Sequence, residues 1–221
     1  MEVRSRKELK FYLAADMMMN RRVFSYTLRQ RIKNILCPDY IMRYLNSMRK
    51  CSYYNYKFKN RHGVVGRIVG GVHLLFFCYY YSCYLRLGIK LGFSIGFDCF
   101  GYGVWLPHHG TIVCGENNRL GKYACLHTSS CITATGKKIG DNCLIATGAK
   151  LINHFDLGKN IMISANSVLN HQIDGDGFLL AGAPAKIKKS LNEPWWNSEH
   201  PLFREVEAIE QLKCKMGLSN L

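Results

Sequence analysis

The stretch IGDNCLIATGAKLINHFDLGKNIMISANSVL, residues 139–169, places an isoleucine or leucine at every sixth position. The same spacing runs through the preceding residues from Cys114, with one extra residue at 136–138 that shifts its phase. A period of six is neither the 3.6 residues of an amphipathic helix nor the two residues of a simple strand. The positions that share this spacing are Cys114, Leu120, Leu126, Ile132, Ile139, Ile145, Leu151, Leu157, Ile163 and Leu169.

This period is typical of a parallel β-helix built from hexapeptides, three of which form one triangular coil. The aliphatic position points into the coil, and the position four residues later is a second inward site that should be small. The residue after each aliphatic position turns a corner, where glycine meets the backbone demand without a Cβ clash. Short antiparallel strands are the less favoured alternative. The corner glycines are Gly115, Gly121, Gly140 and Gly158; the small inward residues are Ala124, Ser130, Cys143, Ala149 and Ser167, with Phe155 and Ile161 as exceptions.

The positive charge of the chain is concentrated in its N-terminal part. The 221 residues carry a formal charge of +15; residues 1–90 hold 18 Lys and Arg against 4 Asp and Glu, and residues 91–221 hold 12 against 11. A basic segment can meet an anionic membrane surface or a phosphorylated substrate. No zinc-ligand spacing or RNA-binding motif accompanies it, so we expect neither a metal site nor a nucleic-acid partner. Ten cysteines without a Cys-x-x-Cys pair or a secretory signal favour reduced thiols in a cytoplasmic protein.

The sequence divides into three parts: a basic helical region at 1–92, the repeat domain at 93–190 and a tail at 191–221. The uncharged run 68–85 is rich in Tyr and Phe and has a basic residue on each side, but it is too polar for a typical membrane span. It predicts an interfacial helix at the inner face of a membrane, or a helix packed across the base of the β-helix or between subunits. In the tail, Trp195 and Trp196 should cap apolar surface ahead of a short amphipathic helix.

Two segments of the repeat domain resemble elements of the serine acetyltransferase family. Residues 106–116, LPHHGTIVCGE, are similar to the L-D-H-x-T-G-I-V-x-G-E segment of that family, and residues 181–186, AGAPAK, to its A-G-x-P-A-[KR] element. The phrases LKFYL (9–13) and LGFSI (91–95) resemble the branch found in polysaccharide-synthesis loci. The resemblance covers residues 93–190 well and residues 1–92 loosely. It implies a left-handed β-helix, acetyl-CoA as donor and active sites in clefts between the subunits of a homotrimer.

The resemblance assigns the role of general base to His108. Acetyl transfer to a hydroxyl needs a base that removes the proton as the oxygen attacks the thioester, and imidazole titrates near neutral pH. His109 follows directly, but neighbouring residues of an extended chain face opposite sides, so only one of the two can act as the base. We assign His109, and His127 in the next coil, to the acceptor side of the site.

The chain departs from the family pattern at three positions. The carboxylate that would orient the base falls at residues 93–94, which are Phe and Ser here, so Asp98 and Glu116 are the remaining candidates. Pro107 replaces the aspartate that helps to hold serine, and the loop 135–138 lacks the family's Arg-His pair. These losses remove much of what would recognise the amino and carboxylate groups of L-serine.

The donor site follows the family pattern more closely. Small residues at the turns let backbone amides approach the pantetheine arm, although each alanine also suits a tight corner of the coil. A lysine at the end of the AGAPAK element can meet a phosphate as a point charge. The residues assigned to the coenzyme are Ala146, Gly148, Ala165, Ala181, Gly182, Pro184 and Lys186.

The sequence therefore predicts an enzyme that moves acetyl from acetyl-CoA to a hydroxyl without a metal. The predicted acceptor is a saccharide, either a sugar of a capsule or surface polysaccharide or its lipid-linked precursor. A serine O-acetyltransferase of cysteine synthesis is the enzymatic alternative. A β-helix that serves as a non-catalytic scaffold is the alternative from another class of protein.

Overall fold

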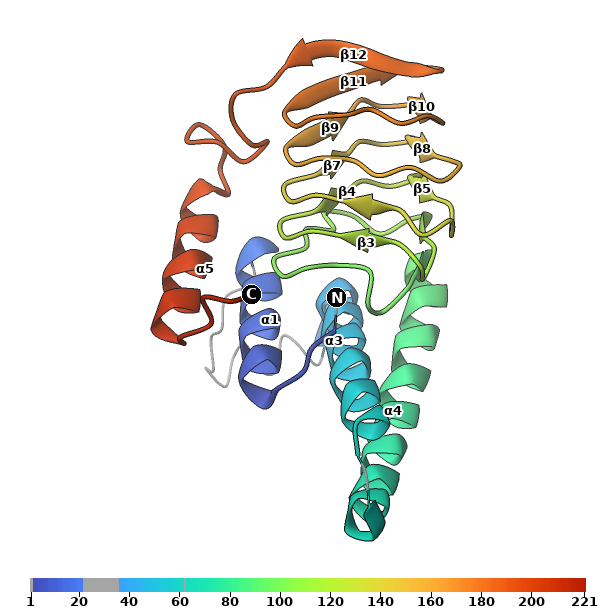
Figure 1. Cartoon of the computed structure of the whole chain (residues 1–221), viewed down its shortest axis with the longest axis vertical. Helices are drawn as coiled ribbons and strands as arrows, with labels where there is room; N and C mark the ends of the chain where they lie inside the picture. Colours follow the sequence, from blue (N-terminus) through green and yellow to red (C-terminus); the bar gives the residue numbers. More distant parts are fainter. Residues whose placement is uncertain (1, 22–35, 62) are drawn as a thin grey trace.

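The repeat folds into a parallel β-solenoid that stands on a base of helices (Figure 1). The computed structural model describes residues 2–21, 36–61 and 63–221. The strands are β1 (Phe93–Ile95), β2 (Ile112–Cys114), β3 (Arg119–Leu120), β4 (Cys125–Leu126), β5 (Cys131–Ile132), β6 (Lys138–Ile139), β7 (Leu144–Ile145), β8 (Lys150–Leu151), β9 (Ile161–Ile163), β10 (Val168–Leu169), β11 (Phe178–Gly182) and β12 (Ala185–Ser190). They form the sheets β1-β2-β5-β8-β10, β12-β11-β9-β7-β4 and β3-β6, which are the three faces of the coil.

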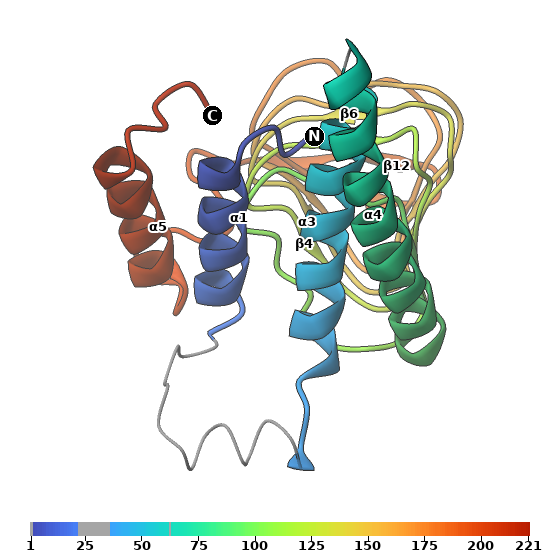
Figure 2. The same cartoon turned by 90° about the horizontal axis from the view of Figure 1, so that it is seen from below.

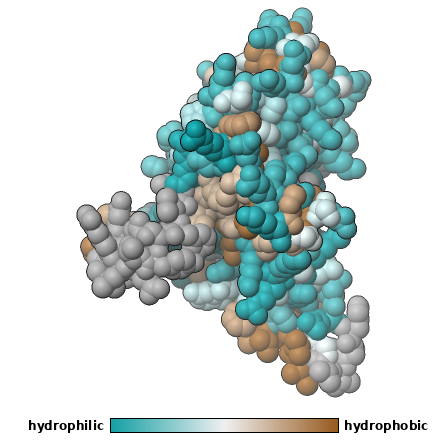
Figure 3. Space-filling view, turned by 90° about the vertical axis from the view of Figure 1, so that its left-hand side faces the viewer, coloured by the Kyte–Doolittle hydropathy of each residue, from teal (hydrophilic) through white to brown (hydrophobic). Residues whose placement is uncertain are grey.

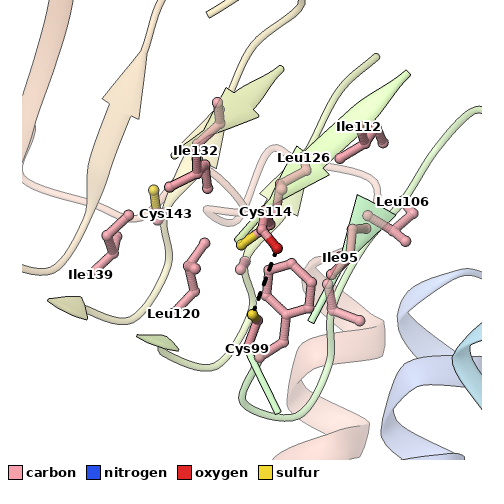
Figure 4. Close-up of a cluster of buried hydrophobic side chains, with 14 of the residues drawn as sticks. Ile95, Cys99, Leu106, Ile112, Cys114, Leu120, Leu126, Ile132, Ile139 and Cys143 are labelled. Atoms are coloured by element: carbon pink, nitrogen blue, oxygen red, sulfur yellow. Dashed lines mark hydrogen bonds between the residues drawn. The ribbon is translucent and has the colours of Figure 1, made fainter. Parts of the chain in front are cut away.

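The aliphatic positions of the repeat all point into the solenoid, as predicted. Each of the ten is at most 6% exposed. Three hexapeptides complete one coil, so Cys131 pairs with Val113 in the coil below and with Lys150 in the coil above. Figure 4 shows the lower part of this stack, where the Sγ of Cys99 lies 3.9 Å from the carbonyl oxygen of Cys114. The two exceptions among the small inward positions, Phe155 and Ile161, are buried as well.

The corner glycines meet a different requirement from the one predicted. None of them has a positive φ; instead, a Cβ at any of the four would lie between 2.1 and 2.7 Å from an atom of the next coil. Coils stack about 4.8 Å apart, which leaves no room for a side chain at that position. The left-handed backbone conformation occurs instead two residues after the corner position of a hexapeptide. It is found there at Tyr123, Ser129, Asn142, Gly148, Asn160 and Asn166.

Three helices form the base within the part of the chain that the structure describes. Helix α1 (Arg6–Met19) begins after Ser5, whose hydroxyl accepts a hydrogen bond from the N–H of Glu8 at 3.1 Å. Helix α3 (Tyr40–Lys59) begins after Pro38, and the side chain of Asp39 caps it by accepting from the N–H of Met42. Helix α4 (Gly63–Leu91) returns antiparallel to α3, and this α3–α4 hairpin projects away from the solenoid (Figure 1). Residues 22–35 of the predicted helical region 1–92 lie outside the described residues.

A buried ion pair joins α1 to α3 and to the first coil. The guanidinium of Arg49 donates to the two carboxylate oxygens of Asp16 at 2.7 and 3.1 Å. It also donates to the carbonyl oxygens of Phe100 and Gly101 at 2.8 and 2.6 Å. Neither charged side chain is more than 1% exposed. A charge can be buried when it is paired and hydrogen-bonded in this way, so the pair fixes the helical base to the solenoid.

The C-terminal tail returns along the outside of the solenoid to the helical base (Figures 1 and 2). Strand β12 runs antiparallel to β11 and is the edge strand of its sheet. Its exposed lysines disfavour pairing with the edge strand of another molecule. Trp195 is buried against the solenoid, where its ring stacks on Trp105 with centroids 5.4 Å apart. The predicted amphipathic helix is α5 (Phe203–Lys215), which packs against α1 through the buried side of Val206 and Ile209.

Candidate active site

One edge of the solenoid carries the predicted histidines and most of the predicted coenzyme-binding residues. Backbone hydrogen bonds stack each turn on the next: the N–H of Gly148 donates to the carbonyl of Thr128 at 3.1 Å, and the N–H of Asn166 to that of Thr147 at 2.9 Å. Residues far apart in sequence thus form one continuous ridge. We call it the histidine edge; it comprises residues 108–110, 127–129, 146–148, 164–166 and 181–183.

His108 and His109 occupy the lowest turn of the histidine edge, and both side chains are exposed. Leu106 points into the core just before them. Gly110 follows with a φ of 138°, and its N–H donates to the carbonyl of Leu91 at 2.9 Å, so the end of α4 holds this turn. Within the described part of the chain neither imidazole makes a hydrogen bond, which leaves both rings open to molecules from solution.

His127 lies in the coil above and is half-buried. Its ring centroid is 6.2 Å from that of Trp105, which pairs with Cys125 across the coil boundary. Burial lowers the pKa of His127 below its ordinary value of 6.5, and a positive charge on His108 lowers it further. The two imidazoles are therefore close enough to interact electrostatically, and His127 is mainly neutral at pH 7.

The side chains of Asp16 in α1 and of Asn20, which caps the C-terminus of α1, hold the backbone that leads to His108. The Oδ1 of Asp16 accepts hydrogen bonds from the N–H groups of Gly103 and Val104 at 2.9 and 3.1 Å. Asn20 accepts from the N–H of Leu106 at 3.3 Å and donates to the carbonyl of Val104 at 2.8 Å. Sequence reasoning missed both residues. The one available signal is that Asp16 is a lone carboxylate within the apolar stretch LAADMMM, where only a buried partner would favour it.

The residues assigned to coenzyme binding follow one another up the same edge. Gly148 has a φ of 77°, and a Cβ there would lie 2.1 Å from the Oδ1 of Asn166. Ala165 is exposed in the next turn, and Gly182, exposed in the last one, donates its N–H to the Oγ of Ser167 at 3.2 Å. The other assigned residues are Ala146 and Ala181, which are half-buried, and Pro184 and Lys186, which are exposed, with Lys186 paired to Ala181.

Asp98 and Glu116 do not join this group. Glu116 follows β2, whereas Gly110 precedes it, so about six extended residues, roughly 20 Å, separate Glu116 from the histidine turn. Glu116 instead lines a cavity of about 420 Å³ together with Phe97 and residues of α4. Asp98 lies near Cys51 of α3, whose pKa is raised mainly by burial and further by the charges of Cys83 and Asp98. Within one copy of the chain, the three residues of β2 therefore carry Glu116 to a different corner from His108, and the role of either carboxylate in orienting His108 stays a prediction.

No metal centre accompanies these residues. Among the residues that the structure describes, no three side chains of His, Cys, Asp or Glu gather closely enough to hold a metal ion. The chemistry that the edge itself offers is that of an exposed imidazole beside a row of small residues and backbone amides.

Comparison with known proteins places this arrangement in context. No family model matches the sequence. The serine acetyltransferase of Staphylococcus xylosus is 31% identical over 125 residues, which are 50% of this chain and 57% of that enzyme. This chain is similar to serine acetyltransferases. That of Staphylococcus epidermidis strain RP62A is 25% identical over 176 residues, 72% of this chain and 76% of the relative.

Solved structures of serine acetyltransferases share the fold of this chain. A Brucella abortus serine acetyltransferase in complex with coenzyme A superposes with a TM-score of 0.57 at 19% identity, covering 85% of this chain and 70% of that one. The Vibrio cholerae serine acetyltransferase gives 0.57 at 14% identity, covering 85% and 68%. At such identities the likeness concerns the fold, and it confirms the predicted β-solenoid with N-terminal helices. The chain spans little more than half the length of the S. xylosus relative.

Proposed function

We propose that this chain is an acetyl-CoA-dependent O-acetyltransferase in which His108 is the general base. The observation that carries the proposal is the histidine edge, where an exposed imidazole stands below a row of small residues in successive coils. The relatives named serine acetyltransferase support the reaction class, and the complex of the B. abortus enzyme with coenzyme A supports the donor.

In the proposed reaction, His108 takes the proton from the acceptor hydroxyl while the oxygen attacks the thioester carbonyl. The new ester C–O bond forms and the C–S bond breaks, and the proton passes to the leaving thiolate, giving coenzyme A and the acetyl ester. An exposed imidazole suits this role because it exchanges protons near neutral pH. His127, which is mainly neutral at pH 7, can donate or accept a hydrogen bond beside the acceptor without repelling a protonated His108.

The donor would lie along the histidine edge, with its acetyl end towards His108. Ala146, Ala165 and Gly182 leave room for the pantetheine arm at three successive turns. Lys186 is exposed beside Ala181 and would meet a phosphate of the coenzyme. This assignment requires no metal.

The proposed acceptor is a saccharide hydroxyl of a capsule or surface polysaccharide or of its precursor. Pro107 and the loop 135–138 support it, because both lack the groups that the family resemblance assigns to serine recognition. L-serine is the second candidate, and the names of the relatives favour it. Within one copy the loop lies at another corner of the coil, where Thr135 contacts Asn153 and His154, so it would face His108 only across the subunit cleft of the proposed trimer.

We also propose that the active assembly is a homotrimer in the cytoplasm, at the inner face of the membrane. His108 and His109 are exposed on a convex edge, and a convex edge alone cannot exclude water from a thioester. A second copy packed beside that edge would close a cleft around the imidazole. The basic character of residues 1–90 supports a location beside an anionic surface.

The test is the release of coenzyme A thiol from acetyl-CoA, with L-serine and saccharides supplied as separate acceptors. We expect turnover with a saccharide, and His108→Ala should reduce it about 10²–10⁴-fold, which is the usual contribution of a general base. His171→Ala is the matched control, because His171 is an exposed histidine at a different corner.

Three outcomes would change the proposal. Efficient acetylation of L-serine, with no turnover of saccharides, would replace the acceptor. An equal loss in His171→Ala would remove the special role of His108. No turnover with any acceptor, by protein that binds the coenzyme, would favour the scaffold.

A further inference from the structure

Helix α4 exposes an apolar surface that no other part of the described chain covers. The helix carries no charged residue from Ile68 to Leu85. Only 11% of its most apolar 18-residue stretch is buried. Ile68, Val72, Leu75 and Tyr79 recur at spacings of three and four residues, so they share one side of the helix. The residues of this surface, which we call the α4 face, are Ile68, Val72, Leu75, Phe76, Tyr79, Leu85 and Ile89, exposed by 69, 49, 71, 45, 62, 45 and 84%.

Basic residues bound the α4 face at both ends. Lys59 and Arg61 are exposed at the tip of the α3–α4 hairpin, and Arg86 and Lys90 are exposed where α4 reaches the solenoid. Arg86 follows Leu75 by eleven residues, which is close to three full turns, so Arg86 lies on the same side as the apolar residues. The ammonium group of Lys90 instead lies 3.7 Å from the ring centroid of Tyr40 in α3. Residues 40–91 contain nine Lys and Arg and no Asp or Glu.

We propose that the α4 face lies on the surface of an anionic lipid bilayer. An apolar strip flanked by cations matches the acyl boundary and the charged headgroups of such a membrane, and exposed tyrosines favour that boundary. A second copy of the chain fits less well. Packing two hairpins together would bring basic residues against basic residues, with no carboxylate in residues 40–91 to pair them.

The shape of the molecule leaves this face accessible. The α3–α4 hairpin extends beyond the base of the solenoid in Figure 1, and apolar surface gathers at the same lower end in Figure 3. The hairpin would lie along the membrane rather than cross it. Helix α3 carries Lys50 and Lys57, whose ammonium groups lie 4.6 Å from the ring centroid of Tyr80 and 5.7 Å from that of Tyr53. Crossing would bring these charges into hydrocarbon, which is strongly unfavourable.

The experiment is flotation of the full chain with vesicles of phosphatidylcholine, alone or mixed with phosphatidylglycerol. We expect the protein to float with the mixed vesicles, to stay behind with pure phosphatidylcholine, and to lose binding as salt is raised. The double variant Ile68→Glu/Leu75→Glu should bind about tenfold less, because it places charge within the apolar strip. Both residues are more than two-thirds exposed, so the fold should survive, which circular dichroism checks.

Ile187→Glu is the matched control. It makes the same change at an exposed isoleucine in β12, at the opposite end of the molecule, and should bind vesicles like the unchanged protein (Figure 1). Equal loss of binding in this control would overturn the proposal, as would unchanged binding of the double variant. The proposal would also be overturned if the unchanged protein does not bind anionic vesicles and its oligomer dissociates in the double variant. A second copy of the chain would then cover the α4 face. Vesicle binding needs no acetyl transfer, so the result is independent of the proposed reaction.

Discussion

At the scale of single residues, the feature that matters most is that His108 and His127 lie on adjacent coils of the solenoid. His108 is exposed and His127 is half-buried, although both belong to the histidine edge. The ring of His127 lies edge-on to that of Trp105, with the ring centroids 6.2 Å apart. Burial disfavours the imidazolium of His127 and so lowers the pKa of that ring. One is suited to moving a proton and the other to a fixed hydrogen bond.

This coupling gives a prediction about the pKa of His127. Replacing His108 with Asn removes the charge that repels a proton on His127, so the pKa of His127 should rise. It should stay below 6.5, because burial is the larger cause of the shift and the variant leaves it in place. Titration of the ring protons by NMR measures both effects. His171→Asn is the control and should leave the pKa of His127 unchanged; a fall in that pKa in His108→Asn would contradict the proximity of the two rings.

At the scale of elements, α1 positions the first coil. Asp16 pairs with Arg49 of α3 and also accepts from the backbone of Gly103 and Val104, so one carboxylate connects two helices and the loop that leads to His108. All of its partners are buried. Helix α1 is therefore part of the platform on which the candidate base stands, even though it lies some ninety residues earlier in the sequence.

Asp16→Asn should destabilise the fold strongly. The amide keeps the size of the side chain but leaves the buried guanidinium of Arg49 without a counter-charge, which typically lowers the free energy of unfolding by about 3–5 kcal/mol. Urea denaturation measures the change. Glu2→Gln is the comparison, since the Glu2–Arg4 pair is 4.0 Å apart and largely exposed, and such pairs contribute less than about 1 kcal/mol. Similar losses in the two variants would show that the buried pair has no special weight.

At the scale of the whole molecule, the tail links the two ends of the fold. It leaves the top of the solenoid after β12, packs Trp195 on the outer face over Trp105, and brings α5 against α1 (Figure 2). The indole N–H of Trp195 donates to the carbonyl of Tyr123 at 3.2 Å. The tail thus covers the sheet beside His127 and connects the solenoid to its helical base.

Trp195→Ala should weaken this connection. Removing a buried indole leaves a cavity over Trp105 and an unpaired carbonyl at Tyr123, and such truncations typically lower the free energy of unfolding by about 3–5 kcal/mol. Thermal unfolding followed by tryptophan fluorescence and circular dichroism measures the change. Trp196→Ala should have a smaller effect, because that ring is only half-buried. If the order of the two variants is reversed, Trp195 is not the anchor of the tail.

The repeat, the helices at both ends and the burial of Trp195 could all be predicted, because each depends on a local pattern. A hexapeptide in a coil experiences nearly the same surroundings as the one three repeats away, so periodicity alone identifies the inward positions. Reliance on local patterns also explains why the corner glycines were predicted to be needed for their φ angle rather than for the close approach of the next coil. The close approach of Gly121 to Asp141 in the next coil is a contact between turns, which a local rule about φ does not include.

The sequence by itself thus determined the solenoid, the helical character of the base and the choice of His108 as the candidate base. Only the tertiary structure decided which residues surround that base. Stacking of coils placed His127 and the small residues of later turns on its edge, whereas the length of β2 carried Glu116 to another corner. The tertiary structure also paired Asp16 with Arg49 and left the α4 face uncovered. Such relations depend on how many residues complete a coil and on which surfaces meet, and neither is contained in a window of neighbouring residues.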